Sequence, residues 1–118
     1  MLISLLKSKL HQARVTDANL EYPGSMGVSR ELLAASGLLP YERVLVSNIA
    51  NGQRFETYVI PVDEPGQIIL NGAAAHCGKR GDRVIVMSFA LLHTDEVAAH
   101  QPTVAVLDAQ NHVIEIHH

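Results

Sequence analysis

The stretch of sequence that best indicates the fold is residues 42–60, ERVLVSNIANGQRFETYVI. Val44 and Val46 are two positions apart, and a period of two places both side chains on one face of a strand. The dipeptide Asn-Gly follows at positions 51–52, and it is the pair most strongly associated with the turn of a β-hairpin. Residues 54–60 then return as a second run with strand character. The stretch therefore predicts a hairpin of two antiparallel strands.

Several further short strands are predicted on both sides of this hairpin. Residues 83–91 form an almost continuous apolar run, which is typical of a strand buried on both of its faces. The remaining strands are expected over residues 2–15, 67–70, 103–107 and 112–116.

Three helical segments are also predicted. Ser29 is suited to the N-cap of a helix that ends at Gly37, because serine favours the N-cap and glycine the position after the last turn. Shorter helical turns are expected within 71–78 and over 94–100, the latter capped by Thr94. Together with the strands they predict a compact, mostly β barrel, whose particular topology the pattern does not specify.

The segment before the first helix contains a pronounced break. Residues 16–19 are rich in turn-forming side chains, and residues 20–22 are expected to be a short extended piece. Pro23, Gly24 and Ser25 then end that piece, because proline and glycine both disfavour regular structure.

Composition limits the classes of protein to which this chain can belong. Of its 118 residues 47% are apolar and 18% charged, which is too hydrophobic for intrinsic disorder, so we expect one domain over residues 1–118. The net charge of −3 argues against nucleic acid or an acidic membrane as the main partner. No apolar run approaches a membrane span, and the N-terminus lacks the pattern of a signal peptide. Cys77 is the only cysteine, which rules out a disulfide within the chain and fits a reducing cytoplasm.

The thiol of Cys77 raises the question of nucleophilic or metal chemistry. His76 is adjacent in sequence, and neighbouring residues of a helix or strand do not face each other, so His76 is poorly placed to activate the thiol. No histidine pair has zinc-binding spacing and no second cysteine is present, so we expect no metal site and a packing role for Cys77. A hydrolase built on Cys77 or Ser25 lacks an identifiable base and orienting residue.

Four separated segments carry a resemblance to a known family. They are residues 9–11 (KLH), 15–25 (VTDANLEYPGS), 51–58 (NGQRFETY) and 71–77 (NGAAAHC). In this order and spacing they resemble the bacterial aspartate 1-decarboxylases. The similarity runs from the N-terminus to about residue 92 and becomes weaker beyond it.

The resemblance implies a fold, an activity and an assembly. Members of the family are pyruvoyl enzymes built on a double-psi β-barrel, and they form homotetramers with active sites between neighbouring subunits. They convert L-aspartate to β-alanine and CO2 in the route to pantothenate and coenzyme A. On this basis we expect a cytoplasmic enzyme that uses neither a metal nor pyridoxal phosphate. Some relatives also require a maturation factor.

The resemblance further implies that the chain cuts itself between Gly24 and Ser25. The Ser25 hydroxyl would attack the Gly24 carbonyl and shift the acyl group from nitrogen to oxygen, and Thr57 would stabilise the oxyanion of this step. Elimination and hydrolysis would leave a pyruvoyl group at position 25, a β chain of residues 1–24 and an α chain of residues 25–118. The substrate amine would then form a Schiff base with the new ketone, which supplies an electron sink that no ordinary side chain offers.

The same resemblance assigns the substrate site. Arg54 would hold a substrate carboxylate in bidentate fashion, Lys9 would add a charge nearby, and Tyr58 would donate a proton to the carbanion. Strand alternation places Arg54 and Tyr58 on one face and Thr57, which is also implied in substrate binding, on the other. A bulge, a twist or a subunit boundary must therefore bring them together. The other residues implied at the site are His11, Tyr22, Asn71, Gly72, Ala73 and Ala74.

Two positions depart from the family's pattern. Pro23 stands where a more flexible residue is expected, and its fixed φ would affect the rate or completeness of self-cleavage. Ser47 stands where relatives often carry a larger apolar side chain, which would alter packing around the substrate. A second interpretation of the chain is a non-catalytic small β-barrel that binds a small acid or oligomerises, with an inert turn at Gly24 and Ser25.

Overall fold

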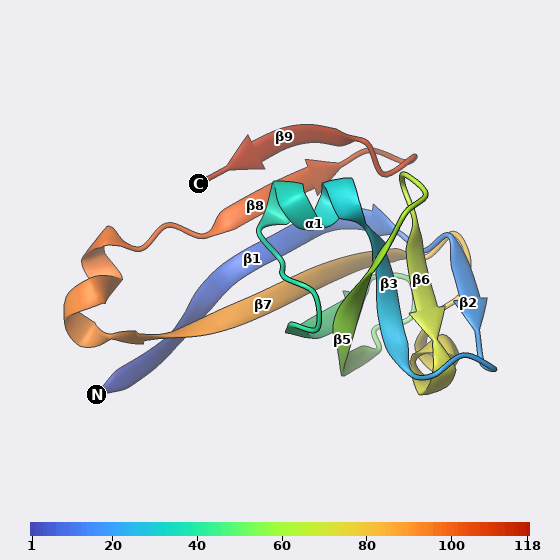
Figure 1. Ribbon diagram of the computed structural model, residues 1–118, viewed down its shortest axis with the longest axis horizontal. Helices are drawn as coiled ribbons and strands as arrows, with labels where there is room; N and C mark the ends of the chain where they lie inside the picture. The colour runs from blue at the N-terminus through green and yellow to red at the C-terminus, as the bar shows by residue number, and fades with distance from the viewer.

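The computed structural model describes residues 1–118 and contains nine strands and three short helices (Figure 1). The strands are β1 (Leu2–Arg14), β2 (Asp17–Asn19), β3 (Ser25–Ser29), β4 (Arg43–Asn48), β5 (Arg54–Val62), β6 (Ile68–Asn71), β7 (Arg83–His93), β8 (Thr103–Leu107) and β9 (Val113–His117). The helices are α1 (Arg30–Ser36) and two 3-10 helices, η1 (Gly72–Cys77) and η2 (Thr94–Ala99). The predicted mostly β fold is confirmed, and the architecture is consistent with a double-psi β-barrel.

The hairpin predicted over residues 42–60 is present as β4 and β5. The two strands are antiparallel, with Ser47 opposite Arg54. Their connection is longer than the Asn-Gly pair alone, because the side chain of Asn51 accepts a hydrogen bond from the Gln53 amide at 2.9 Å and supports a wider loop. The prediction of the hairpin is confirmed.

The sheet closes on itself through the junction of β1 and β2. The strand order is β2-β6-β3-β5-β4-β7-β1-β8-β9, so β1 and β2 lie far apart in it although only two residues separate them in the chain. The Val15 amide donates to the Asp82 carbonyl at 2.9 Å, and the Thr16 amide donates to the Ile68 carbonyl at 2.8 Å. The first bond extends the pairing of β1 with β7 and the second extends that of β2 with β6, so the chain at residues 15–16 connects the two sides of the sheet into a barrel.

The barrel interior is filled by side chains without aromatic rings. The buried cluster has 18 apolar members, none of them aromatic, and Phe55 packs against it from the margin. The largest fully buried side chains are Leu10, Met26, Leu32, Ile68 and Leu70. A core of this kind follows from the aliphatic composition of the chain, which has no Trp.

The helix predicted after the break is confirmed as α1. Ser29 precedes its first residue, and Gly37 follows its last with a left-handed φ of 78°. The Ser29 hydroxyl does not cap the helix but donates to the Glu64 carbonyl at 2.5 Å and accepts from the Gln67 amide at 2.6 Å. Ser29 therefore ties the start of α1 to the connection between β5 and β6.

The second half of β7 is exposed, contrary to the prediction of a wholly buried strand. Phe89 is 48% and Leu91 67% exposed. β4 pairs with β7 only from Val84 to Met87, so beyond Met87 the strand pairs with β1 alone. The two strands leave the barrel as a two-stranded ribbon that ends at η2, which we call the β1–β7 ribbon (Figure 1).

The segment predicted to be a turn and a break contains two short strands. Asp17 lies opposite Ile69 in the parallel pair β2·β6, and Ser25 lies opposite Asn71 in the antiparallel pair β3·β6. Residues 20–22, predicted to be extended, form the turn instead. The prediction was wrong here because the partner strand is about 50 residues away in sequence, and local pattern does not report such pairing.

The helical turns predicted within 71–78 and over 94–100 are confirmed as η1 and η2. The N-cap of η2 is His93 rather than Thr94, because the His93 amide donates to Glu96 Oε1 at 2.8 Å. That side chain satisfies a donor that the first turn would otherwise leave free.

Candidate active site

Ser25 is buried at the start of β3, beside the end of β6. The residue is 3% exposed and lies opposite Asn71. Asn71 Nδ2 donates a hydrogen bond to Ser25 Oγ at 3.2 Å, and the Ser25 hydroxyl donates to the Pro23 carbonyl at 3.4 Å. The reactive hydroxyl predicted at this position is thus oriented by a side chain and shielded from bulk water.

The backbone of Gly72 packs directly against that of Gly24. A Cβ atom at Gly72 would lie 2.6 Å from Gly24 Cα and 2.9 Å from the Tyr22 carbonyl oxygen, so no side chain fits. The φ of Gly72 is 62°, a left-handed value that also favours glycine. The first residue of η1 therefore braces the junction of Gly24 and Ser25 from one side.

A cavity of about 410 Å³ opens beside this junction. It is lined by residues from β5, from η1 and from the junction itself: Gly24, Phe55, Glu56, Thr57, Tyr58, Ala73, Ala74 and Cys77. β3 and β5 pair in parallel with Met26 opposite Val59, and this register brings Gly24 to the level of Thr57. The structure thus brings together the predicted cleavage residues and Tyr58, the predicted proton donor.

Arg54 lies on the outer face of the sheet and does not line this cavity. Exposure alternates along the start of β5, with Arg54 exposed, Phe55 half-buried and Thr57 half-buried. β5 pairs with β3 and with β4 without any register shift, so no bulge turns Arg54 towards Thr57. Of the three ways in which these residues were expected to meet, the structure excludes the bulge.

Lys9 lies on the same outer face, at a distance from β5. Lys9 is opposite Met87, Met87 is opposite Leu45, and Leu45 is opposite Glu56. Residues directly opposite share a face, so this row spans three strand spacings, or about 14 Å. Within one copy of the chain, Lys9 does not reach the cavity.

His11 and Tyr22 also lie outside the cavity. Burial, together with the nearby charge of Lys9, lowers the pKa of His11 from its ordinary value and favours the neutral imidazole. His11 Nδ1 is buried and has no hydrogen-bond partner. The side chain of Tyr22 is 60% exposed, and only its carbonyl approaches Gly72.

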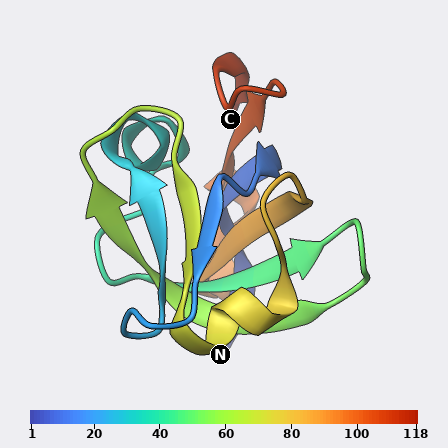
Figure 2. The same ribbon diagram turned by 90° about the vertical axis from the view of Figure 1, so that its right-hand side faces the viewer.

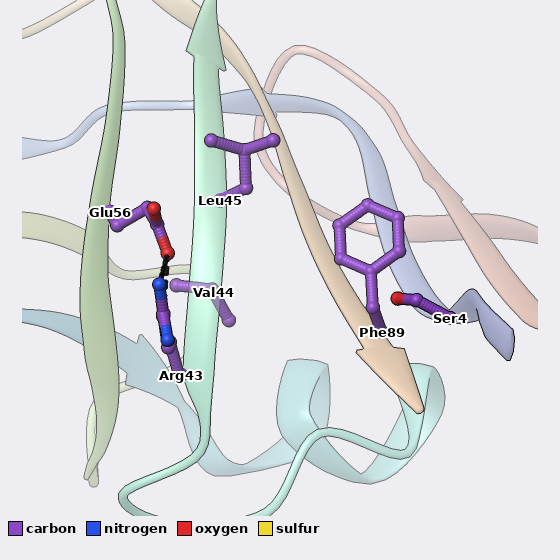
Figure 3. A pocket seen from close by; sticks show the side chains of 6 residues that line it. All are labelled: Ser4, Arg43, Val44, Leu45, Glu56 and Phe89. Atoms are coloured by element: carbon purple, nitrogen blue, oxygen red, sulfur yellow. Dashed lines mark hydrogen bonds and ion pairs between the residues drawn. The ribbon is translucent and has the colours of Figure 1, made fainter. Parts of the chain in front are cut away.

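A second hollow, of about 340 Å³, lies on the outer face (Figure 3). The ion pair between Arg43 and Glu56 crosses one side of it, and the exposed ring of Phe89 lies on the other. Leu45, which belongs to the row that contains Lys9, lines its floor. The outer face therefore combines a hollow, exposed apolar surface and two cations without acidic partners, Lys9 and Arg54.

Three residues that line the cavity were not predicted to do so, namely Phe55, Glu56 and Cys77. Phe55 lies two positions from Thr57, so the alternation that directs Thr57 inward directs Phe55 inward as well. Cys77 was predicted to be packing, and it is half-buried at the cavity wall while His76 is exposed. No group of three or more His, Cys, Asp or Glu side chains that could hold a metal occurs in the structure.

Fold and site together define a small, mostly β protein with a glycine–serine junction, its serine buried, beside a cavity. The family model described as aspartate decarboxylase matches residues 1–114. An aspartate 1-decarboxylase of Coprothermobacter proteolyticus is 49% identical over 117 residues, which cover 98% of this chain and 96% of the relative. Aspartate 1-decarboxylases of Campylobacter jejuni and Caldicellulosiruptor saccharolyticus are each 48% identical over 98% of this chain, and over 92% and 91% of their own lengths. The chain belongs to the aspartate decarboxylase family, which confirms the resemblance.

Proposed function

We propose that this chain decarboxylates L-aspartate to β-alanine and CO2, using a pyruvoyl group that it makes from Ser25. Family membership supports the reaction and the substrate. The observation that carries the mechanism is the burial of Ser25 next to Gly24, with its hydroxyl held by Asn71. The product would serve the synthesis of pantothenate and coenzyme A.

The chain would first cut itself at this junction. Ser25 Oγ attacks the Gly24 carbonyl carbon, the amide C–N bond breaks and an ester forms. Elimination then breaks the Cβ–Oγ bond, frees the Gly24 carboxylate and leaves dehydroalanine, which water converts to a pyruvoyl group with release of ammonia. The products would be a β chain of residues 1–24 and an α chain of residues 25–118, which we take to be parts of one domain.

The surroundings of residue 25 fit such a group. The position is buried, and Asn71 Nδ2, which donates to Ser25 Oγ before cleavage, is a donor next to the residue whose Cα would become the ketone carbon. A donor suits a ketone oxygen, which can only accept. Once formed, the pyruvoyl group supplies the electron sink that α-decarboxylation requires. This scheme uses neither a metal nor pyridoxal phosphate.

Side chains around the cavity would supply the remaining chemistry. Thr57, on the inward face of β5 beside Gly24, would stabilise the oxyanion of the first cleavage step. Tyr58 lines the same cavity and would donate a proton to the substrate carbon. The residues proposed to surround the substrate are Asn71, Gly72, Ala73 and Ala74, with His11 and Tyr22 in supporting positions.

We propose that the active enzyme is a homotetramer with its sites between subunits. Arg54 and Lys9 are the proposed partners of the substrate carboxylates, and both lie on the outer face of their own chain. A neighbouring copy that packs on this face would bring them to a second cavity. The exposed Phe89 and Leu91 of the β1–β7 ribbon suit burial against another copy.

No helix in the structure has both the length and the apolar character needed to cross a membrane. We propose a cytoplasmic location, with neither nucleic acid nor membrane as a partner, in keeping with the net charge of −3. A maturation factor is a further candidate partner, because Pro23 stiffens the chain just before the cleavage site.

Intact mass under denaturing conditions tests this function. The purified chain should separate into fragments of residues 1–24 and 25–118, and aspartate should yield CO2. Ser25→Ala should keep the chain whole and release no CO2, whereas Ser4→Ala, at an exposed serine, should behave as wild type. Decarboxylation by Ser25→Ala would contradict the pyruvoyl mechanism. An uncut and inactive wild-type chain would exclude cleavage by the chain alone, and would leave either cleavage that needs a maturation factor or the non-catalytic barrel with an inert turn.

A further inference from the structure

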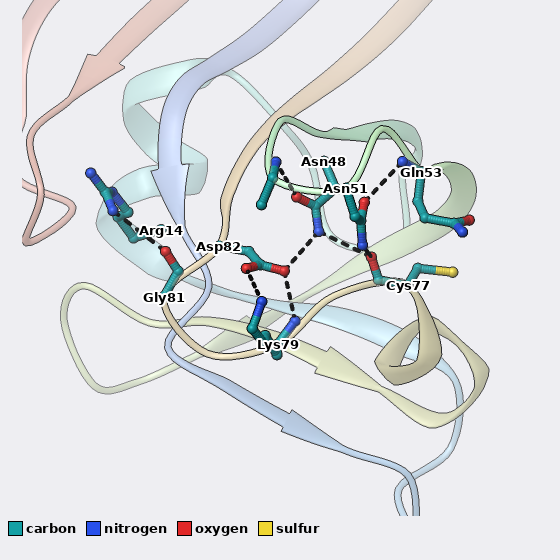
Figure 4. A network of polar contacts seen from close by, with 9 residues as sticks. Arg14, Asn48, Asn51, Gln53, Cys77, Lys79, Gly81 and Asp82 are labelled. Atoms are coloured by element: carbon teal, nitrogen blue, oxygen red, sulfur yellow. Dashed lines mark hydrogen bonds and ion pairs between the residues drawn. The ribbon is translucent and has the colours of Figure 1, made fainter.

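A buried polar network holds the C-terminal end of η1 (Figure 4). Asn48, at the end of β4, donates through Nδ2 to the Cys77 carbonyl and to Asp82 Oδ2, each at 3.0 Å. Asn51 Nδ2 donates to the same Cys77 carbonyl at 3.1 Å. The last residue of η1 is therefore bonded to two side chains that belong to the hairpin of β4 and β5.

Asp82 is the buried centre of this network. The residue is 5% exposed, and its Oδ2 atom accepts from the Lys79 amide at 3.0 Å in addition to Asn48. Its Oδ1 atom forms an ion pair with Lys79 Nζ, also at 3.0 Å. A buried carboxylate with all these partners is rigid, because moving it away from any of them leaves charge or polarity unsatisfied.

The chain that leaves η1 packs tightly against the same network. A Cβ atom at Gly78 would lie 2.9 Å from Asn48 Nδ2 and 2.9 Å from Leu70 Cδ1. There is no free space into which this segment can shift towards β4 or β6. The position of Cys77 is consequently tied to that of Asn48.

The other end of η1 touches the cleavage junction. η1 has only six residues, and its first residue, Gly72, packs on the backbone of Gly24. The residue before η1 is Asn71, which holds the Ser25 hydroxyl. A displacement of Cys77 would therefore shift the whole of this short helix, and with it the contact of Gly72 with Gly24 and that of Asn71 with Ser25.

We propose that Asn48 and Asp82 are positioning residues for self-cleavage. By fixing Cys77, they hold η1 where Gly72 braces Gly24 and where Asn71 reaches the Ser25 hydroxyl. Neither side chain lines the cavity, so neither touches the reacting atoms. The inference rests on the proposed self-cleavage and adds a part of the molecule that none of the resembling motifs assigns to it.

The test compares self-cleavage rates with thermal stability in a set of purified variants. Asn48→Ala and Asp82→Ala should each slow the appearance of the 25–118 fragment by about tenfold or more at 25 °C, which corresponds to about 1.4 kcal/mol in the barrier. Asp82→Asn keeps an oxygen that accepts from Asn48, so it should recover part of the loss. Asn51→Ala removes the exposed donor to the Cys77 carbonyl and the acceptor of the Gln53 amide, leaves the bonds of Asn48 in place, and should slow cleavage less than Asn48→Ala.

A core variant separates positioning from general destabilisation. Val84 is fully buried and lies opposite Asn48 in the pair β4·β7. Its apolar side chain cannot donate a hydrogen bond to the Cys77 carbonyl. Val84→Ala should lower Tm at least as much as Asn48→Ala and slow cleavage less than about threefold, a barrier change below about 0.7 kcal/mol.

Three results would overturn the inference in different ways. If cleavage rate follows Tm across the whole set, with Val84→Ala as slow as Asn48→Ala, the network is structural and does not position the junction. If wild type stays whole under all conditions, the proposed function fails and the positioning role fails with it. Cleavage of wild type together with equally fast cleavage of Asn48→Ala refutes only the positioning role.

Discussion

The two 3-10 helices, η1 and η2, are equally long but are held in different ways. They lie at opposite ends of the molecule in Figure 1, and Figure 2 looks onto the η1 end. η1 buries Gly72 and Ala74, has no side-chain cap of its own, and is bonded to Asn48 and Asn51 of a distant hairpin. η2 buries none of its residues and is capped by Glu96 from within its own first turn.

This difference separates a segment that can position a site from one that cannot. A helix bonded at both ends to distant strands transmits a shift at one end to the other, because neither end has a free direction in which to relax. A helix that is capped locally at the end of an exposed ribbon can move without consequence for the barrel. We therefore expect substitutions at η1 to act on self-cleavage and those at η2 to act only on local stability.

The largest expected effect is at the contact between η1 and the cleavage junction. Gly72→Ala should slow self-cleavage by about a hundredfold or more, about 2.7 kcal/mol in the barrier, because the new Cβ would lie 2.6 Å from Gly24 Cα. Intact mass over time measures it. Gly52→Ala is the matched control, since Gly52 has a similar φ of 76° and nothing within 4 Å of its Cβ position. Equal self-cleavage rates for Gly72→Ala and Gly52→Ala would refute the role of the contact between Gly72 and Gly24.

The next effect concerns the exposed ribbon that leads to η2. Phe89→Lys combined with Leu91→Lys should convert the proposed tetramer to smaller species, because two charges replace apolar surface that we expect another copy to cover. Light scattering after size exclusion measures the mass in solution. Ile114→Lys alters an exposed apolar residue of β9 and serves as the control. A double variant that stays tetrameric would place the subunit contacts elsewhere.

A smaller effect is expected in the acid stability of the network at η1. The hydrogen bond from Asn48, only partly opposed by burial and assisted by Lys79, lowers the pKa of Asp82 below its ordinary 3.8. The resulting stabilisation is complete above that value and is lost as the pH falls through the pKa of the folded state.

Urea unfolding at a series of pH values checks whether stability falls with pH in this way. Below about pH 4 the free energy of unfolding of wild type should fall more steeply than that of Asp82→Asn, which has no carboxyl group to protonate. Asp63→Asn, at an exposed carboxylate paired with Arg30, should keep the wild-type slope. Parallel curves for wild type and Asp82→Asn would show that Asp82 titrates alike in both states.

The smallest effect is expected at η2. Glu96→Ala removes the acceptor of the His93 amide and should lower the free energy of unfolding by about 0.5–1 kcal/mol, with no change in the rate of self-cleavage. Urea unfolding and intact mass provide the two readouts, and Glu115→Ala on β9 is an exposed control. Slower cleavage by Glu96→Ala would remove the distinction between the two helices.

The elements that could be predicted from the sequence are those whose cause is local. The alternation and Asn-Gly pair of residues 42–60 predicted β4 and β5, and Ser29 with Gly37 predicted the limits of α1. β2 and β3 were missed because they are extended through pairing with strands distant in sequence, β2 with β6 and β3 with both β6 and β5. The exposed half of β7 was missed because an apolar run does not tell which partner covers it.

The candidate site divides in the same way. The resemblance named Gly24, Ser25, Thr57 and Asn71, and the structure brings these residues to one junction and its cavity. The same resemblance named Lys9, which the structure leaves about three strand spacings away on the outer face. Which of the named residues meet within one chain could not be predicted, because it depends on the register of strands that are distant in sequence.

By itself, the sequence determined a mostly β chain, its hairpin and its first helix, and its resemblance to the family implied a self-cleavage at Gly24. Local propensity and strand periodicity are sufficient for the fold elements. Only the tertiary structure decided that Thr57 faces Gly24 while Arg54 faces outward, and that Asn48 and Asp82 hold η1. Those relations arise from barrel closure and from buried hydrogen bonds between distant segments, which no local pattern encodes.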